Sequence, residues 1–211
     1  MSLFLDSANP EDARQARALD CIAGITTNPT LIAQTGRPAL MVIRELCELT
    51  SGPVFYQLTR ADYVGMLAEA EQADAISPGQ VVMKVPCTWE GLRAVCHLHG
   101  KTLCAVTAVF TPAQAYLAAE VGARYIIPYV NRATRLLGDG PALVQQMTAV
   151  LQRGNRGHET EILAASIKSP EEAVAALLAG AQHLTLPLSV ILQMAESPYT
   201  AQVLAEFASG R

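Results

Sequence analysis

Apolar residues gather in short runs along the chain, and longer segments of mixed polarity separate these runs. Eight runs have the length of a β-strand and cover residues 3–5, 22–26, 54–58, 81–85, 102–107, 125–129, 161–165 and 183–186. Most of them are continuously apolar, which is typical of strands buried on both faces of a parallel sheet. The segments between them are long enough for helices, so the pattern predicts strands and helices in alternation.

Helix start signals support this interpretation. A capping residue followed by proline occurs at Asn9, Thr111 and Ser169, as at the first turn of many helices. Glycines fall where two of the predicted helices should end. Two polar stretches, 133–140 and 152–159, are predicted to be loops.

Parallel strands joined by helices form either a doubly wound sheet or a closed barrel. A doubly wound sheet uses about six such units, whereas this chain offers the eight of a (β/α)8 barrel. No glycine-rich dinucleotide loop follows the first strand, which disfavours a Rossmann-like sheet. We therefore predict an α/β protein with one (β/α)8, or TIM, barrel over residues 1–211 and an extra C-terminal helix at about 197–209.

Composition limits the partners and the location. The net charge is −4 over 211 residues and no basic cluster occurs, so nucleic acid is not expected to bind. The N-terminus lacks the pattern of a signal peptide, and no apolar run approaches the roughly 18 residues of a membrane helix. We expect a soluble cytoplasmic protein that acts on small molecules, with no membrane partner.

The cysteines and histidines do not indicate a metal site. The five cysteines are an odd number without a Cys-x-x-Cys pair, which suggests free thiols in a reducing compartment. Of the four histidines, His97 and His99 are close in sequence, but they fall in a helical segment where alternate residues diverge. His158 and His183 are isolated. No metal ion or other cofactor is expected.

Lys84 stands inside the apolar run Val-Val-Met-Lys-Val-Pro, at residues 81–86. Lysine is among the residues least often buried, because an ammonium loses its hydration there. Desolvation lowers the pKa of a buried lysine and favours the neutral amine, which is a nucleophile. The alternative is a lysine at a strand end whose side chain extends to water.

Polar residues follow or end most of the predicted strands. In a (β/α)8 barrel the carboxyl ends of the strands form the active site. These residues are Asp6, Thr26, Asn28, Gln57, Lys84, Thr107, Tyr129, Asn131, Arg132, Ser166 and Lys168. An amine, a carboxylate, a phenol and a guanidinium without metal ligands fit carbonyl chemistry through a Schiff base.

Three other interpretations of these residues stay open. Lys168 could replace Lys84 as the amine, because it follows Ser166 by two positions. Cys87 lies near Lys84 and could be a nucleophile, although no partner base is indicated. The barrel could also be non-catalytic, with Lys84 binding a ligand such as pyridoxal phosphate.

Six segments of the chain resemble the transaldolase family, and within it the small fructose-6-phosphate aldolases. They occur in the family's order and span nearly the whole chain. The segments are Leu-Asp-Ser at 5–7, Gly-Ile-Thr-Thr-Asn-Pro at 24–29, Val-Met-Lys-Val-Pro at 82–86, Pro-Tyr-Val-Asn-Arg at 128–132, Leu-Ala-Ala-Ser-Ile-Lys at 163–168 and Thr-Leu-Pro at 185–187.

The resemblance implies a metal-independent, class I aldolase that reversibly cleaves fructose 6-phosphate, or a similar ketose phosphate, to dihydroxyacetone and glyceraldehyde 3-phosphate. Lys84 would form the Schiff base. Asp6 would relay protons and bind substrate hydroxyls, and Thr107 would position a catalytic water. Further residues would bind the substrate: Thr26 and Asn28 the dihydroxyacetone part, and Arg132 and Ser166 the phosphate.

A few positions separate the subfamilies. Transaldolases, which transfer a dihydroxyacetone unit between sugar phosphates, usually carry Glu, Phe and Asn at the positions of Gln57, Tyr129 and Ala105. This chain follows the aldolases at all three, and Tyr129 is the expected acid–base group. Ile127 departs from both subfamilies and is expected to narrow the pocket. Trp89 is also unusual, and we expect it to pack on the outside of the barrel.

The predicted C-terminal helix carries an apolar stripe of Val203, Leu204 and Phe207 that needs a partner. This stripe could pack on its own barrel or on another subunit. In similar aldolases the terminal helix reaches a neighbouring subunit in ring-shaped, often decameric assemblies. The resemblance therefore implies a homo-oligomer, with a decamer as one possible size.

Overall fold

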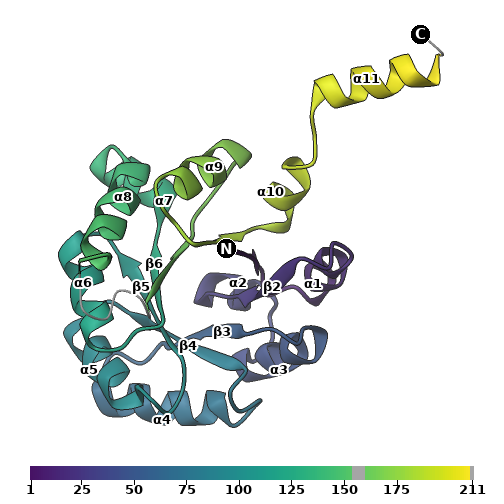
Figure 1. Cartoon of the computed structure of the whole chain (residues 1–211). Helices are drawn as coiled ribbons and strands as arrows, with labels where there is room; N and C mark the ends of the chain where they lie inside the picture. Colours follow the sequence, from purple (N-terminus) through teal and green to yellow (C-terminus); the bar gives the residue numbers. More distant parts are fainter. Residues whose placement is uncertain (154–159, 210–211) are drawn as a thin grey trace.

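The structure is a computed structural model that describes residues 1–153 and 160–209 (Figure 1). Its strands β1 to β8 are hydrogen-bonded in chain order, and β8 pairs with β1 to close a barrel. All neighbouring strands are parallel. The predicted (β/α)8 barrel is thereby confirmed.

The strands lie where the apolar runs predict them, with ends that differ by no more than two residues. They are β1 (Ser2–Asp6), β2 (Ile22–Thr26), β3 (Val54–Gln57), β4 (Val81–Pro86), β5 (Cys104–Val109), β6 (Tyr125–Pro128), β7 (Glu161–Ala164) and β8 (His183–Leu186). Most residues of strands β3 to β8 are buried, because the barrel interior covers one face of each strand and the helices cover the other.

The helices form the outer layer of the barrel, and the predicted caps are present. Asn9, Thr111 and Ser169 each accept a backbone N–H bond at the start of a helix whose first residue is proline. The helices are α1 (Pro10–Arg17), α2 (Pro29–Gln34), α3 (Ala39–Leu49), α4 (Tyr63–Asp74), α5 (Trp89–Leu98), α6 (Pro112–Glu120), α7 (Val130–Leu137), α8 (Gly140–Leu151), α9 (Pro170–Leu178), α10 (Leu188–Gln193) and α11 (Pro198–Ala208).

The loop predicted at 133–140 is wrong, because most of it belongs to α7. Val130 and Ala133 bury one side of this short helix, and the polar residues on its other sides hide that stripe in the sequence. Only residues 138 and 139 separate α7 from α8. The Thr134 hydroxyl of α7 accepts from Gly140 N at 3.1 Å and joins the two helices. The loop predicted at 152–159 lies outside the described residues except for 152 and 153, and so does His158.

The interior of the barrel is filled by side chains and closed at its amino-terminal end. Four rings pack edge-on or tilted across it, from Phe4, Phe55, Tyr125 and His183, with centroids 5.3–6.4 Å apart. Above them lie Val82, Ala105, Ile127, Leu163 and Ala165. The barrel is therefore a packed core with one polar end and not a pore.

The predicted C-terminal helix is present as α11, and it extends away from the barrel (Figure 1). None of its residues is buried. Tyr199, Leu204 and Phe207 are 78%, 60% and 72% exposed. No helix within the described residues is both long and apolar enough to cross a membrane.

Candidate active site

Lys84 lies in the middle of the polar end of the barrel and is only 3% exposed. It is paired in register with Gln57 on β3 and Ala105 on β5, and its Nζ donates to the carbonyl of Thr27 at 3.0 Å. Burial lowers the pKa of Lys84 from its usual 10.5 to about 8, although the nearby Asp6 charge acts in the opposite direction. The side chain does not extend to water, and its neutral form is accessible near physiological pH.

Asp6 ends β1 beside Lys84 and belongs to a chain of hydroxyl groups. Thr26 donates to Asp6 Oδ1 at 3.0 Å and lies 2.6 Å from the hydroxyl of Thr185. Since Thr26 has one proton and gives it to Asp6, Thr185 must be the donor to Thr26. Burial raises the pKa of Asp6, and the Lys84 charge and the Thr26 hydrogen bond oppose this change. The result is a fixed carboxylate with increased basicity next to the amine.

Thr185 is a site residue that the sequence analysis missed. Threonine is common in strands, so its presence in β8 gives no signal by itself. Its position in the strand could have identified it. Thr185 lies two residues after His183, so both side chains share one face of β8, and β8 pairs with β1, which carries Asp6.

Thr107 and Tyr129 form the opposite wall. Thr107 donates to the Tyr129 oxygen at 2.9 Å, which leaves the phenol proton free to be donated elsewhere. A bulge follows Thr107, where Ala108 adopts a φ of 58° and the pairing with β6 shifts. Bulges often redirect side chains next to active sites. Burial raises the pKa of Tyr129, so this group is a protonated acid at neutral pH.

Two neighbours hold the ring of Tyr129. Phe110 packs edge-on at 6.1 Å between ring centroids, and the Arg132 guanidinium lies 5.3 Å from the ring centroid. The ring is therefore fixed from two sides and points its oxygen into the barrel mouth, toward Thr107.

Gln57 and Asn28 offer amide groups to the site. Gln57 is half-buried at the end of β3, and its Oε1 is buried with no hydrogen-bond partner among the described residues. An amide oxygen accepts a hydrogen bond but does not take up a proton at neutral pH. Asn28 caps α2 by accepting from Leu31 N at 3.0 Å, so only its NH2 group remains available for a substrate.

The predicted phosphate-binding residues lie at the exposed rim. Arg132 and Lys168 are exposed, and Ser166 is half-buried with a φ of 58°, which non-glycine residues rarely adopt. Asn131 N, in the first turn of α7, donates to the Ser166 carbonyl at 3.0 Å and so joins this helix to the loop after β7. The Lys168 charge acts on Asp6, so this lysine is on the same end of the barrel. Only Lys84 of the two rival lysines is desolvated.

Cys87, Trp89 and Ile127 are the remaining residues for which the sequence raised an expectation. Burial raises the pKa of Cys87 and keeps its thiol protonated, which argues against a thiolate nucleophile. The expected packing of Trp89 on the outside of the barrel is wrong: this side chain is 73% exposed at the first residue of α5, next to the end of β4. Ile127 is fully buried in the interior and paired with Thr107, directly below the site.

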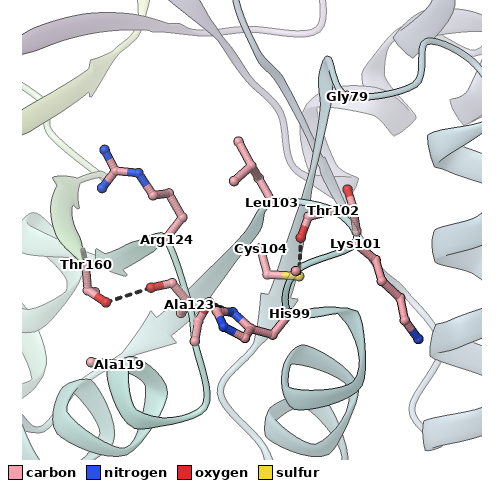
Figure 2. A pocket seen from close by; sticks show the side chains of 12 residues that line it. Gly79, His99, Lys101, Thr102, Leu103, Cys104, Ala119, Ala123, Arg124 and Thr160 are labelled. Atoms are coloured by element: carbon pink, nitrogen blue, oxygen red, sulfur yellow. Dashed lines mark hydrogen bonds between the residues drawn. The ribbon is translucent and has the colours of Figure 1, made fainter. Parts of the chain in front are cut away.

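Another cavity, of about 320 Å³, lies at the opposite end of the barrel between the starts of β5, β6 and β7 (Figure 2). Its walls are mostly apolar. Two of its polar side chains contact backbone carbonyls, His99 that of Gly122 at 3.3 Å and Thr160 that of Ala123 at 2.7 Å. This cavity holds none of the predicted site residues. In the described parts of the chain, no group of three or more His, Cys, Asp or Glu residues could hold a metal ion.

Comparison with known proteins matches this geometry to a family. A family model described as transaldolase/fructose-6-phosphate aldolase matches residues 3–209. A "probable transaldolase" of Geotalea uraniireducens (strain Rf4) is 38% identical over 208 residues, which cover 98% of this chain and 96% of that protein. Another, of Pelotomaculum thermopropionicum (strain DSM 13744 / JCM 10971 / SI), is 41% identical over 98% of this chain and 95% of its own length.

Solved structures support the fold. Orotidine 5'-monophosphate decarboxylase of Metallosphaera sedula superimposes with a TM-score of 0.63 at 15% identity, over 95% of this chain and 94% of that one. A mandelate oxidase variant gives 0.62 at 18% identity, over 89% of this chain and 64% of that one. Such low identities show the barrel alone. The match over the whole length and the relatives near 40% identity show that the chain belongs to the transaldolase/fructose-6-phosphate aldolase family.

Proposed function

We propose that the protein is a Schiff-base aldolase that cleaves fructose 6-phosphate, or a similar ketose phosphate, to dihydroxyacetone and glyceraldehyde 3-phosphate. The observation that carries this proposal is the amine of Lys84, which is buried with a pKa of about 8 beside Asp6. A neutral amine among polar side chains at the carboxyl ends of the strands is the group that condensation with a ketone needs. The proposed partners are therefore sugars and sugar phosphates.

The reaction begins when neutral Lys84 Nζ attacks the C2 carbonyl and water leaves, which gives an iminium ion. The C4 hydroxyl then loses its proton to the Asp6 relay, the C3–C4 bond breaks, and its electrons move to the iminium nitrogen. Glyceraldehyde 3-phosphate leaves at this stage. The remaining enamine takes a proton at C3, and water hydrolyses the new iminium to release dihydroxyacetone and free Lys84.

Gln57 and Tyr129 favour the aldolase over the transaldolase. An aldolase must protonate the enamine, whereas a transaldolase must keep it for a second aldose. Tyr129 is a protonated phenol whose proton is not used by Thr107, so it can protonate the enamine directly or through water. Gln57 cannot act as a proton acceptor in place of a glutamate.

Transaldolase is the second candidate function. The relatives from Geotalea and Pelotomaculum both carry the name "probable transaldolase", and both align over nearly their whole length. Their names favour transfer of a dihydroxyacetone unit between sugar phosphates as strongly as Gln57 and Tyr129 favour cleavage.

One assay separates these two functions. The unmodified enzyme is given fructose 6-phosphate with and without erythrose 4-phosphate, and both glyceraldehyde 3-phosphate and free dihydroxyacetone are measured. An aldolase releases both products in both cases. Glyceraldehyde 3-phosphate that appears only with erythrose 4-phosphate, without free dihydroxyacetone, would make the protein a transaldolase, and release of neither product in either case would exclude both candidates.

Arg132 is expected to bind the phosphate of the aldehyde. An arginine at the rim can make two parallel charged hydrogen bonds to a phosphate. Arg132→Ala should raise KM for glyceraldehyde 3-phosphate on the order of tenfold or more, as expected for loss of a charged hydrogen bond, and leave KM for glyceraldehyde nearly unchanged. The exposed Arg135, one turn further along α7, provides the matched control Arg135→Ala. Equal losses for both aldehydes would make Arg132 structural.

Helix α11 is proposed to bind a second copy of the chain. Its most exposed apolar side chains are Tyr199, Leu204 and Phe207. They form an apolar surface that is unfavourable in water unless another surface packs on it. Phe207→Glu should reduce the particle mass measured by light scattering toward that of one chain. Ala205→Glu places the same charge on the opposite side of α11 and serves as control. A monomeric unmodified protein would disprove this proposal.

The cytoplasm is the proposed place of action. All five cysteines are free, and two of them, Cys21 and Cys96, are exposed. Exposed thiols persist best in a reducing compartment. Sugar phosphates are small and charged. We expect such substrates to reach the polar end of the barrel directly from solution.

A further inference from the structure

Glu172 connects the first turn of α7 to the loop after β7 at the rim of the proposed site. It is the third residue of α9, after the capping residue Ser169. Its Oε1 accepts from Asn131 Nδ2 at 2.6 Å, and its Oε2 accepts from the backbone N–H of Lys168 at 2.8 Å. One carboxylate thus joins a helix that follows β6 to a loop that follows β7.

Helix capping explains only half of this arrangement. In α6 the corresponding third residue is Gln114, and its oxygen accepts from the backbone of Phe110 at 2.9 Å and of Thr111 at 3.1 Å. Both of those bonds are local, as in an ordinary capping box. Glu172 makes the local bond with one oxygen and uses the other for Asn131, 41 residues away.

The two segments that Glu172 joins carry the predicted phosphate-binding residues. Arg132 follows Asn131 in the first turn of α7, and Ser166 precedes Lys168 by two positions in the loop after β7. The backbone bonds from Asn131 N to Ser166 O at 3.0 Å and from Val130 N to Ala165 O at 2.8 Å also hold these segments together. The side chain of Glu172 adds a contact to the Asn131 side chain and to Lys168 N.

We propose that Glu172 is a positioning residue that sets the distance between Arg132 and the segment 166–168, so that both can hold one phosphate group. This inference rests on the proposed function, because it assumes that a phosphorylated aldehyde binds at this rim. Glu172 itself does not touch the substrate. A small displacement of groups that clamp a substrate is enough to weaken its binding.

The charge of Glu172 separates positioning from simple electrostatics, because the two predict opposite changes in phosphate binding. A carboxylate near a phosphate repels it, so electrostatics alone predicts that a neutral residue at this position would improve phosphate binding. Gln can keep both contacts, because the Asn131 amide can turn over and accept from the Gln NH2 group. Ala removes the charge together with both contacts. Positioning therefore predicts that Glu172→Ala weakens phosphate binding.

The test is Glu172→Ala, with two aldehydes and one simple anion. KM for glyceraldehyde 3-phosphate should rise on the order of tenfold or more, the loss expected from hydrogen bonds to a charged group. KM for unphosphorylated glyceraldehyde and kcat should change less than twofold. Glu171→Ala removes the same charge from the same turn of α9, at an exposed position, and should change neither KM.

A second variant tests the partner. Asn131→Ala should raise the same KM, and the double variant should be no worse than Glu172→Ala alone, because Glu172→Ala already removes the contact to Asn131. The inference is overturned if KM for the phosphorylated aldehyde falls in Glu172→Ala, if both aldehydes lose equally, or if Glu171→Ala has the same effect.

Calorimetric titration with inorganic phosphate separates this inference from the proposed function, because it needs no turnover. Weaker phosphate binding by Glu172→Ala than by Glu171→Ala supports positioning even if no ketose is cleaved, in which case only the proposed function fails. An unmodified protein that cleaves fructose 6-phosphate, yet whose phosphate affinity equals that of Glu172→Ala, overturns the inference alone.

Discussion

Lys84→Met is expected to abolish aldol turnover, since no other buried amine lies at the mouth of the barrel in the described residues. With a pKa of about 8, about one Lys84 in ten is neutral at pH 7, against roughly one in 3,000 for a lysine at its usual 10.5. The rate of iminium formation should therefore rise with pH and level off above about 8. Dihydroxyacetone with borohydride should trap the covalent adduct on the peptide that contains Lys84.

The two other lysines of the chain are the controls for this experiment. Lys101→Met and Lys168→Met should both keep the trapped label, because Lys101 lies before β5 at the opposite end and Lys168 is exposed. A label on Lys168, or no label at all, would contradict the assignment of Lys84. A visible absorbance of the purified protein would point instead to a bound pyridoxal phosphate.

Tyr129→Phe is expected to lower the aldol rate on the order of 10²-fold or more, which is typical for loss of a general acid–base group. The change removes the phenol proton and also the acceptor of the Thr107 hydroxyl. Adding Gln57→Glu to Tyr129→Phe should move activity toward transfer, because a carboxylate then stands beside the amine. Release of free dihydroxyacetone and formation of the transfer product are the two quantities to measure.

Tyr125→Phe is the matched control for this variant. Tyr125 begins β6, whereas Tyr129 directly follows that strand, and Tyr125 belongs to the ring cluster at the closed end of the barrel. Its loss of a hydroxyl should leave the rate nearly unchanged. If the two variants lose activity equally, Tyr129 acts through the packing of the barrel and not through proton transfer.

The sequence predicted the strands well for a physical reason. A barrel strand is buried on both faces, so its apolar run is continuous and stands out even at four residues, as in Tyr125–Pro128. Helix α7 was missed because only Val130 and Ala133 are buried and the rest of its surface is polar. Two buried positions are too few to show a period in the sequence.

The site was predictable where one residue conflicts with its surroundings. Lys84 in an apolar strand is such a conflict, and burial in the structure bears out its unusual environment. Thr185 and Glu172 produce no conflict, since threonine suits a strand and glutamate suits the first turn of a helix. Their roles depend on contacts with residues 159 and 41 positions away. Such contacts exist only once the barrel has closed.

The ring cluster of Phe4, Phe55, Tyr125 and His183 has a consequence for the order of binding. Because it fills the amino-terminal end of the barrel, reactants reach Lys84 from the carboxyl ends of the strands. Lys84 is buried at that end, and Arg132 is exposed at its rim. A covalently held three-carbon fragment is therefore deeper than the aldehyde. We expect dihydroxyacetone to bind first and the aldehyde second in synthesis, and the aldehyde to depart first in cleavage.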